Sequence, residues 1–135
     1  MSFHTIIIVG NLGRDPEMRY APNGNAVTSL NVASNRQYTD SSGQRVKETT
    51  WFRVSVWGKQ AESCNTYLQK GSSVLVEGEL RPDKDTGGPR TYTRTDGSTA
   101  ASYDVTARTV RFLTTRGGEE GMADEPGVEN EDIPF

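Results

Sequence analysis

The residues best suited to binding chemistry lie in segment 50–57, where alternate positions differ in character. If this segment is a β-strand, one face carries only apolar side chains and the other carries Trp51, Arg53 and Trp57. Bases stack on aromatic rings and phosphates pair with arginine, so the second face suits a flexible polyanion that carries flat bases. The alternative is that both indoles are buried against a loop or a second subunit. The apolar face consists of Phe52, Val54 and Val56.

Residue types that enzymes and metal sites need are scarce. The single Cys64 excludes an internal disulfide and a cysteine-based zinc site, and the single His4 excludes a two-histidine metal motif. The chain has no Gly-x-Ser-x-Gly elbow, no P-loop and no His/Glu cluster, which argues against the rival class, a small hydrolase. The sequence therefore predicts a binding protein that needs no cofactor and is not an enzyme.

Charge is divided unevenly along the 135 residues, whose formal net charge is −3. All 15 Lys and Arg lie at or before Arg116, while residues 117–135 hold seven acids and no base, so the two parts carry +4 and −7. A split of this kind suggests two functions. We expect residues 1–114 to form a domain that binds phosphate, and residues 115–135 to form a flexible, disordered acidic tail.

Turn residues divide the body into five expected strands and one helix. Gly10 and Gly13 are expected to end the first strand, whose run Ile6–Val9 reads as buried on both sides. Gly71 is expected to stop the helix, and segment 82–102 to form a long polar hairpin or loop. The expected strands are 5–9, 26–38, 44–57, 74–80 and 103–112, and the expected helix is 59–70.

Five strands with one short helix between the third and fourth is the element order of an all-β, five-stranded OB-fold barrel, although a small sandwich with one helix fits the same order. No apolar run approaches the roughly 20 residues of a membrane span, and the first residues lack a secretory signal, so we expect a cytoplasmic protein without membrane contact. The apolar run Ile6–Val9 and the outward Leu75 also predict self-association.

Several motifs resemble those of bacterial single-stranded DNA-binding proteins. The resemblance covers residues 4–112 and about the last six residues of the chain. The terminal Asp132, Ile133, Pro134 and Phe135 match the acidic, hydrophobic tip of that family. The matching body motifs are Val9-Gly10-Asn11-Leu12-Gly13-Arg14-Asp15-Pro16-Glu17-Met18-Arg19-Tyr20, Pro22-Asn23-Gly24, Trp51-Phe52-Arg53-Val54, Trp57-Gly58-Lys59, Tyr67-Leu68, Lys70-Gly71 and Val76-Glu77-Gly78.

This resemblance implies a homotetramer that binds single-stranded DNA without sequence preference, coats and protects it in replication, recombination and repair, and associates with the nucleoid. It also implies that the tip recruits replication and repair proteins. The implied stacking residues are Trp51, Trp57 and Tyr38, with Tyr92 replacing a tryptophan that many members carry after the fourth strand. The implied phosphate contacts are Arg53, Lys59, Lys70 and Arg81. Further basic candidates are Arg36, Lys47, Lys84, Arg90 and Arg94.

Four alternatives stay open or are weighed against this interpretation. Tyr38 and Tyr92 are also consistent with ordinary loop anchors. The Gly10 to Gly13 spacing is similar to the clamp of KH domains, but that clamp joins two helices and this spacing follows a strand, so a turn is favoured. A primosomal adaptor would share the barrel without the tip, and a cold-shock-like RNA binder would use the same stacking residues.

Overall fold

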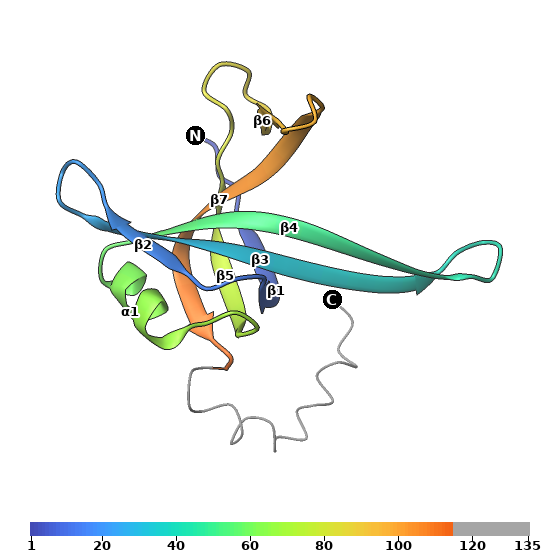
Figure 1. The fold of residues 1–135 in the computed structure, drawn as a ribbon, viewed down its shortest axis with the longest axis horizontal. Coiled ribbons are helices and arrows are strands. Elements are labelled where there is room, and N and C mark those ends of the chain that lie inside the picture. The colour runs from blue at the N-terminus through green and yellow to red at the C-terminus, as the bar shows by residue number, and fades with distance from the viewer. Residues whose placement is uncertain (115–135) are drawn as a thin grey trace.

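The computed structural model describes residues 1–114, which form a small β-barrel with two projecting hairpins (Figure 1). Seven strands and one helix occur in this part of the chain. In chain order they are β1 (Ile6–Leu12), β2 (Glu17–Tyr20), β3 (Ala26–Thr39), β4 (Arg45–Trp57), α1 (Lys59–Tyr67), β5 (Ser73–Leu80), β6 (Arg90–Thr93) and β7 (Thr99–Phe112).

Five of these strands close into a barrel. They are hydrogen-bonded in the order β1-β5-β7-β4-β3, and β3 pairs with β1 again to complete the circle. The β4–β7 pair is parallel and the other pairs are antiparallel. Since α1 lies between the third and fourth barrel strands, the predicted OB-fold is confirmed. The short strand β2 was not predicted from the sequence, and β6 lies in segment 82–102, which was predicted as a hairpin or a loop.

Alternation along β4 shows why this sequence forms a barrel wall. Val54 and Val56 are fully buried, whereas Arg53 and Trp57 on the alternate face are exposed and Ser55 is half-buried. The helix lies over one opening of the barrel, where Cys64 is buried, and burial raises the pKa of its thiol to about 12. Cys64 is therefore a small apolar core residue at neutral pH. The core comprises Ile8, Leu12, Leu30, Val32, Val54, Val56, Cys64, Leu68, Val74, Val76 and Val105.

Two polar side chains attach α1 to the strands beneath it. Thr28 donates its hydroxyl to the carbonyl of Ala61 at 2.7 Å in the buried interior. Gln60 donates from Nε2 to the carbonyl of Arg108 at 2.9 Å and accepts from the amide of Val110 at 3.0 Å, both on β7. The helix is thereby fixed to β3 on one side and β7 on the other.

Two predictions about the first strand were wrong, its end and its burial on both sides. It runs through Gly10 as far as Leu12, because Gly10 is buried where a Cβ would lie 2.2 Å from the carbonyl oxygen of Ala33 on β3. The glycine permits close packing of two strands and does not make a turn. The run is also not buried on both sides, since Ile8 is buried and Ile7 is 61% exposed.

The predicted helix was three residues too long. It ends at Tyr67, because Leu68 adopts an extended conformation and buries its side chain in the core. Gly71 has a φ of +93° and belongs to the turn that follows, so it does not cap the helix directly. Within residues 1–114, no helix has the length and apolar character that crossing a membrane requires.

Two hairpins project from the barrel in different directions (Figure 1). The first, here called the distal arm, is formed by residues 34–50 at the ends of β3 and β4. The second, here called the pocket arm, is formed by residues 90–102, where β6 pairs with the start of β7. The polar segment 82–102 therefore contains the hairpin that the sequence predicted as one of two possibilities.

Candidate nucleic-acid interface

The two tryptophans lie on the outer face of β4, as the alternation of the sequence predicted. Trp51 is 51% exposed and Trp57 is 44% exposed, while Val54 between them is fully buried. The two tryptophans are six positions apart, which corresponds to about 20 Å along a strand. The face therefore presents two half-exposed aromatic side chains at a spacing that fits several stacked bases.

The floor between the tryptophans consists of small or polar residues. On β3, Ala33 lies opposite Trp51, Asn31 lies opposite Arg53, and Ser29 lies opposite Ser55. Directly opposite residues of antiparallel strands share one face of the sheet. The low floor leaves the rings raised above their surroundings, and it offers hydroxyl and amide groups for hydrogen bonding.

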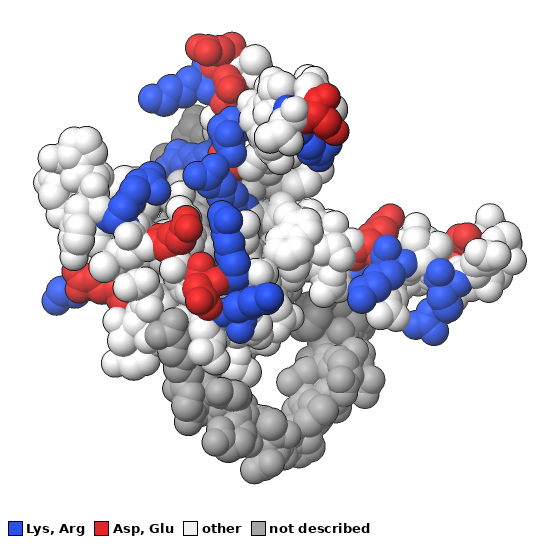
Figure 2. Space-filling view, viewed as in Figure 1, with Lys and Arg blue, Asp and Glu red and all other residues white. Residues whose placement is uncertain are grey.

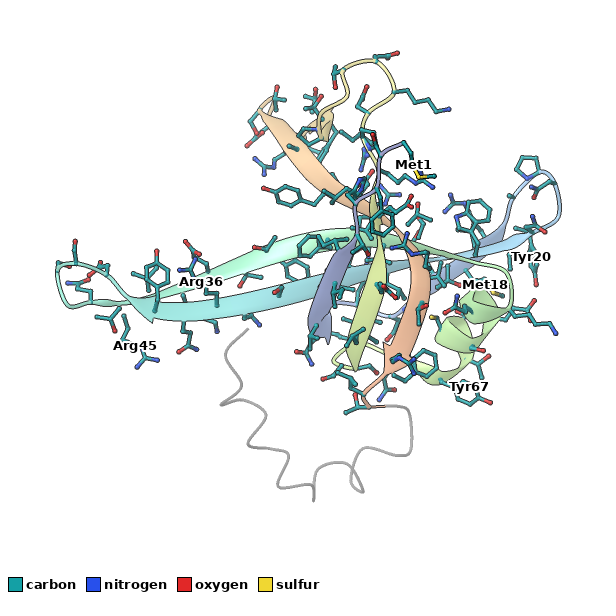
Figure 3. The ribbon with its side chains drawn as sticks, turned by 180° about the vertical axis from the view of Figure 1, so that it is seen from behind. Met1, Met18, Tyr20, Arg36, Arg45 and Tyr67 are labelled. Atoms are coloured by element: carbon teal, nitrogen blue, oxygen red, sulfur yellow. The ribbon has the colours of Figure 1, made fainter. Side chains whose placement is uncertain are left out.

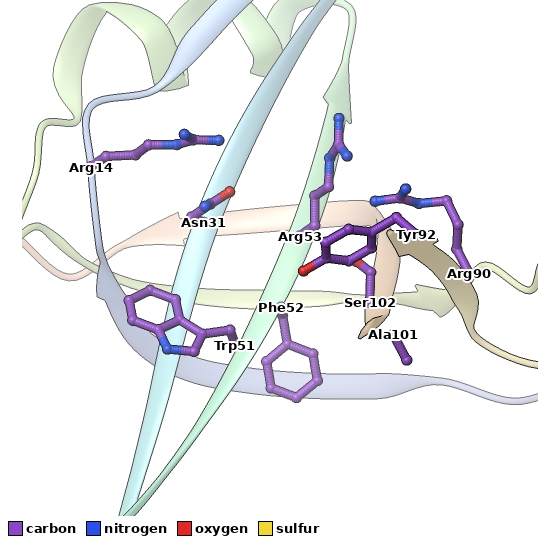
Figure 4. Close-up of a pocket in the computed structure, with 9 residues that line it drawn as sticks. All are labelled: Arg14, Asn31, Trp51, Phe52, Arg53, Arg90, Tyr92, Ala101 and Ser102. Atoms are coloured by element: carbon purple, nitrogen blue, oxygen red, sulfur yellow. The ribbon is translucent and has the colours of Figure 1, made fainter. Parts of the chain in front are cut away.

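An open pocket of about 430 Å³ lies beside Trp51 (Figure 4). In this view Asn31 lies above the ring of Trp51 and Arg53 above the ring of Tyr92, while Phe52 lies below them. The pocket is positively charged because three of its lining side chains are arginines. Its lining residues are Arg14, Asn31, Trp51, Phe52, Arg53, Arg90, Tyr92, Ala101 and Ser102.

The arginines of the pocket differ in how they are held. Arg90 donates from Nε to the carboxylate of Asp104 at 3.0 Å, and its guanidinium carbon lies 5.5 Å from the centre of the Tyr92 ring. Asp104 also accepts from the hydroxyl of Ser102. Among the ion pairs of residues 1–114, none involves Arg14 or Arg53. Arg90 is preorganised by its neighbours, and the other two guanidinium groups are available to an incoming anion.

The distal arm carries a second group of predicted residues, away from the pocket. Arg36 lies over the Tyr38 ring at 4.5 Å and pairs with Glu48 at 3.6 Å. Tyr38 donates its hydroxyl to the same carboxylate at 3.3 Å. Lys47 is the residue before Glu48 on β4 and lies opposite Gln37. Figure 3 shows Arg36 and the nearby Arg45 far out on this arm.

The remaining basic candidates are spread around the barrel. Lys59 begins α1 two residues after Trp57, and Lys70 lies in the turn after the helix. Arg81 donates from Nε to the hydroxyl of Thr106 at 2.9 Å, next to the pocket arm. Lys84 and Arg94 are exposed in the loops before and after β6. The predicted tip Asp132, Ile133, Pro134 and Phe135 lies outside the described residues.

Lysine and arginine side chains gather in a band that runs from the top of the molecule down to the left of its centre, and again on the distal arm (Figure 2). Acidic side chains lie beside both groups in this view. The structure thus brings Trp51, Arg53, Arg90 and Tyr92 together around one pocket. It places Arg36 and Tyr38 on one face of the distal arm and Lys47 on the other face.

Sequence reasoning missed five of the nine residues that line the pocket, which are Arg14, Asn31, Phe52, Ala101 and Ser102. Asn31 could have been found from strand parity, because the register of β3 and β4 places it opposite Arg53. Arg14 gave no such signal, since it follows the end of β1 and reaches the pocket only through the closure of the barrel. Phe52 was expected to be core, and it is only partly buried and lines the pocket.

A family model described as the single-strand binding protein family matches residues 3–113. The chain belongs to this family. Single-stranded DNA-binding proteins from Neisseria meningitidis serogroups A and B are each 38% identical to it over 123 residues, which cover 91% of this chain and 67% of theirs. The single-stranded DNA-binding protein of Wolinella succinogenes is 34% identical over 130 residues, covering 96% and 73%.

Solved structures of this family share the barrel. A deletion mutant of the single-stranded DNA binding protein from Thermus aquaticus superposes with a TM-score of 0.62 at 31% identity, covering 84% of this chain and 52% of that one. The chain thus spans about half of that protein. A small single-stranded DNA-binding protein from Streptomyces coelicolor gives a TM-score of 0.66 at 26% identity, covering 83% and 95%. Membership of the single-strand binding protein family and the OB-fold are therefore supported by both sequence and structure.

Proposed function

We propose that this chain binds single-stranded DNA without sequence preference and without catalysis, and that it coats and protects unpaired DNA at the nucleoid during replication, recombination and repair. The observation that carries the proposal is the outer face of β4, where Trp51 and Trp57 are half exposed above a floor of small residues. Family membership and the names of the relatives support the same ligand.

The binding mechanism follows from the chemistry of this face. Bases stack on Trp51 and Trp57, and on Tyr92 at the far side of the pocket, at about 1–3 kcal/mol per base. Arg53 and Arg14 pair with phosphates and release counterions, which makes binding weaker as salt rises. Because the rings need unstacked bases, the protein binds only the unpaired strand and keeps it unpaired by mass action.

The central experiment is a titration of tryptophan emission with oligo-dT. Trp51→Ala and Trp57→Ala should each weaken binding by about 1–3 kcal/mol and leave the thermal midpoint unchanged, since neither ring belongs to the core. Tyr67→Ala is a matched control, because Tyr67 is as exposed as Trp51 but lies on α1 against Phe112. Loss of folding or of oligomers in either tryptophan variant, with unchanged DNA affinity, would show that the indoles serve packing.

Two further titrations define the ligand. Duplex DNA of the same length should quench little of the tryptophan emission, because its bases are stacked inside the helix and cannot reach the rings. An oligo-rU of the same length separates a DNA binder from an RNA binder, since stacking alone accepts either sugar. Equal or tighter binding of oligo-rU would assign the protein to RNA.

We also propose that the chain forms a homotetramer. The outer surface of the β1–β5 pair carries Ile7, which is 61% exposed, and the half-buried residues Val9 and Leu75, which lie opposite each other. An exposed apolar strand surface of this kind is suited to burial against a second copy. Light scattering should give a mass of about four chains at micromolar concentration, and a stable monomer would contradict the proposal.

For the acidic tail we propose a role separate from DNA binding. Residues Asp132–Phe135 combine acidic and apolar side chains, which suits a partner pocket with an apolar floor and a basic rim. Replication and repair proteins are the proposed partners. Deletion of Asp132–Phe135 should abolish partner docking and leave oligo-dT affinity equal or slightly higher. Deletion of 117–135 should raise that affinity further in dilute salt, because seven negative charges are removed. A loss of oligo-dT affinity in this variant would mean that the tail is part of the DNA-binding site.

A further inference from the structure

The benzene edge of the Trp51 ring packs against Gly13. A Cβ built on Gly13 would lie 2.5 Å from Cζ3 and 2.6 Å from Cη2 of the indole, closer than real Cβ contacts allow. No backbone atom of another residue appears among the near neighbours of that Cβ. The benzene edge of Trp51 therefore occupies the space that a side chain at residue 13 would fill.

The backbone at Gly13 has no other need for glycine. Its φ is not among the positive values that several glycines of this chain adopt, so alanine fits its backbone conformation. The contrast with Gly10 is informative, because there the added Cβ meets the carbonyl oxygen and carbon of Ala33 in the adjacent strand. At Gly13 the obstacle is a single aromatic side chain.

The chain at Gly13 is also unable to retreat from the ring. Its amide donates to the carbonyl of Asn31 at 2.9 Å. The preceding Leu12 is fixed on both backbone groups, donating to the carbonyl of Ser72 and accepting from the amide of Gly71, each at 2.9 Å. The Leu12 side chain is 3% exposed in the core. Any added side chain at residue 13 must therefore move the indole and not the backbone.

We propose that Gly13 is a positioning residue for DNA binding: the space left at residue 13 lets the Cζ3–Cη2 edge of the Trp51 ring pack against the end of β1, which fixes the orientation in which the ring meets a base. The proposal rests on the proposed function of the Trp51 face. Immobilising the ring before binding lowers the entropy that stacking must otherwise overcome. Gly13 lies next to Arg14 in the chain, so the same backbone segment supports both a stacking ring and a cation of the pocket.

The test compares Gly13→Ala in the wild-type chain with Gly13→Ala in a Trp51→Phe background. Phenylalanine lacks the part of the indole that the added methyl group meets. Gly13→Ala should weaken oligo-dT binding by about 5- to 100-fold, up to the loss caused by removing a stacking ring. In the Trp51→Phe background the same change should weaken it by less than about twofold, because the two positions are coupled.

Two glycine controls separate positioning from folding. Gly88→Ala adds a methyl group whose nearest neighbour is the Thr86 hydroxyl at 3.7 Å, so the thermal midpoint and affinity should not change. Gly10→Ala should lower the thermal midpoint strongly, because the methyl group meets backbone. Gly13→Ala should resemble Gly88→Ala in thermal midpoint. A fall as large as that of Gly10→Ala that Trp51→Phe does not relieve, or an equal loss of affinity in the Trp51→Phe background, would overturn the proposal.

A measurement without DNA keeps this proposal distinct from the proposed function. With Trp57→Phe as background, Trp51 is the only tryptophan, and Gly13→Ala should lower its emission anisotropy and raise its quenching by acrylamide. Unchanged emission would overturn the positioning role even if DNA binds. If the wild-type chain fails to bind oligo-dT, the proposed function fails while the emission still decides the role of Gly13. If Gly13→Ala alone does not fold, recovery by Trp51→Phe supports the contact and its absence refutes it.

Discussion

The distal arm and the pocket arm contain the same three-part arrangement in different surroundings. Each has an arginine that lies over the tyrosine two residues later and pairs with a carboxylate on the adjacent strand, Arg36 with Glu48 and Arg90 with Asp104. In the distal arm the side chains of the ion pair are 64% and 50% exposed, and in the pocket arm 36% and 24%. The two arms therefore share the same interactions, but the ion pair of the pocket arm is more buried than that of the distal arm.

Register explains the difference between the arms. Glu48 lies directly opposite Arg36, so that pair stays on the hairpin itself. Arg90 lies opposite Ser102, and its carboxylate partner Asp104 is two residues closer to the barrel. Arg90 therefore leans toward the body of the protein and lines the pocket with Tyr92. Arg90 and Tyr92 thus line the pocket because Asp104, the ion-pair partner of Arg90, lies close to the barrel.

The largest expected effect is a difference in DNA affinity between the arms. The double variant Arg90→Ala/Tyr92→Ala should weaken binding of a short oligo-dT of about 8 nucleotides by about 10- to 100-fold, since it removes a stacking ring and a cation beside Trp51. The matched variant Arg36→Ala/Tyr38→Ala should weaken it by less than about fivefold. Fluorescence anisotropy of labelled oligo-dT measures both. Equal losses would mean that burial does not distinguish the arms.

A smaller effect is expected on stability when the carboxylates are neutralised. Asp104→Asn should lower the free energy of unfolding by about 1–3 kcal/mol, because a partly buried acceptor of two hydrogen bonds is weakened. Glu48→Gln should change it by less than about 0.5 kcal/mol, since an exposed ion pair contributes little. Urea denaturation measures both variants. A Glu48→Gln variant as unstable as Asp104→Asn would contradict the contrast drawn from burial.

The smallest effect concerns the turns at the two tips, where the arms are alike. Hydrogen bonds from the Ser42 hydroxyl hold the pKa of Asp40 below its ordinary value, and hydrogen bonds from the Ser98 hydroxyl do the same for Asp96. A lowered folded-state pKa stabilises the turn above the unfolded pKa, and that stabilisation is lost as pH falls through the folded value. An NMR titration of the carboxyl carbons should give both values below 3.8. A pKa above 3.8 for either Asp40 or Asp96 would mean that the two turns are not alike.

Local pattern predicted those parts of the site that depend on one strand. The alternation in segment 50–57 placed both tryptophans outward and Val54 inward, because side chains of a strand alternate whatever lies around it. The five barrel strands and the position of the helix followed from turn residues and periodicity. Tyr92 came from resemblance, and the structure places it across the pocket from Trp51.

What the sequence could not predict depends on distant parts of the chain meeting. Gly10 and Gly13 read locally as breaks, yet one admits the backbone of Ala33 and the other the ring of Trp51. Nothing in the sequence of the first strand indicates either contact, because both partners are distant in the sequence. Arg14 was overlooked for the same reason, because the pocket that it lines includes residues from β3, β4, β6 and β7.

The side chain of Gln60 has a consequence for how the barrel meets other chains. Parallel pairing of β4 with β7 ends at Thr106, so the next backbone groups of β7 on that side would form an unpaired edge. An unpaired edge invites strands of other molecules to add to it. The primary amide of Gln60 offers the same donor and acceptor as a peptide group and bonds Arg108 and Val110 as one strand residue would. Through this one side chain, the helix occupies the backbone groups of Arg108 and Val110 that strand addition would need.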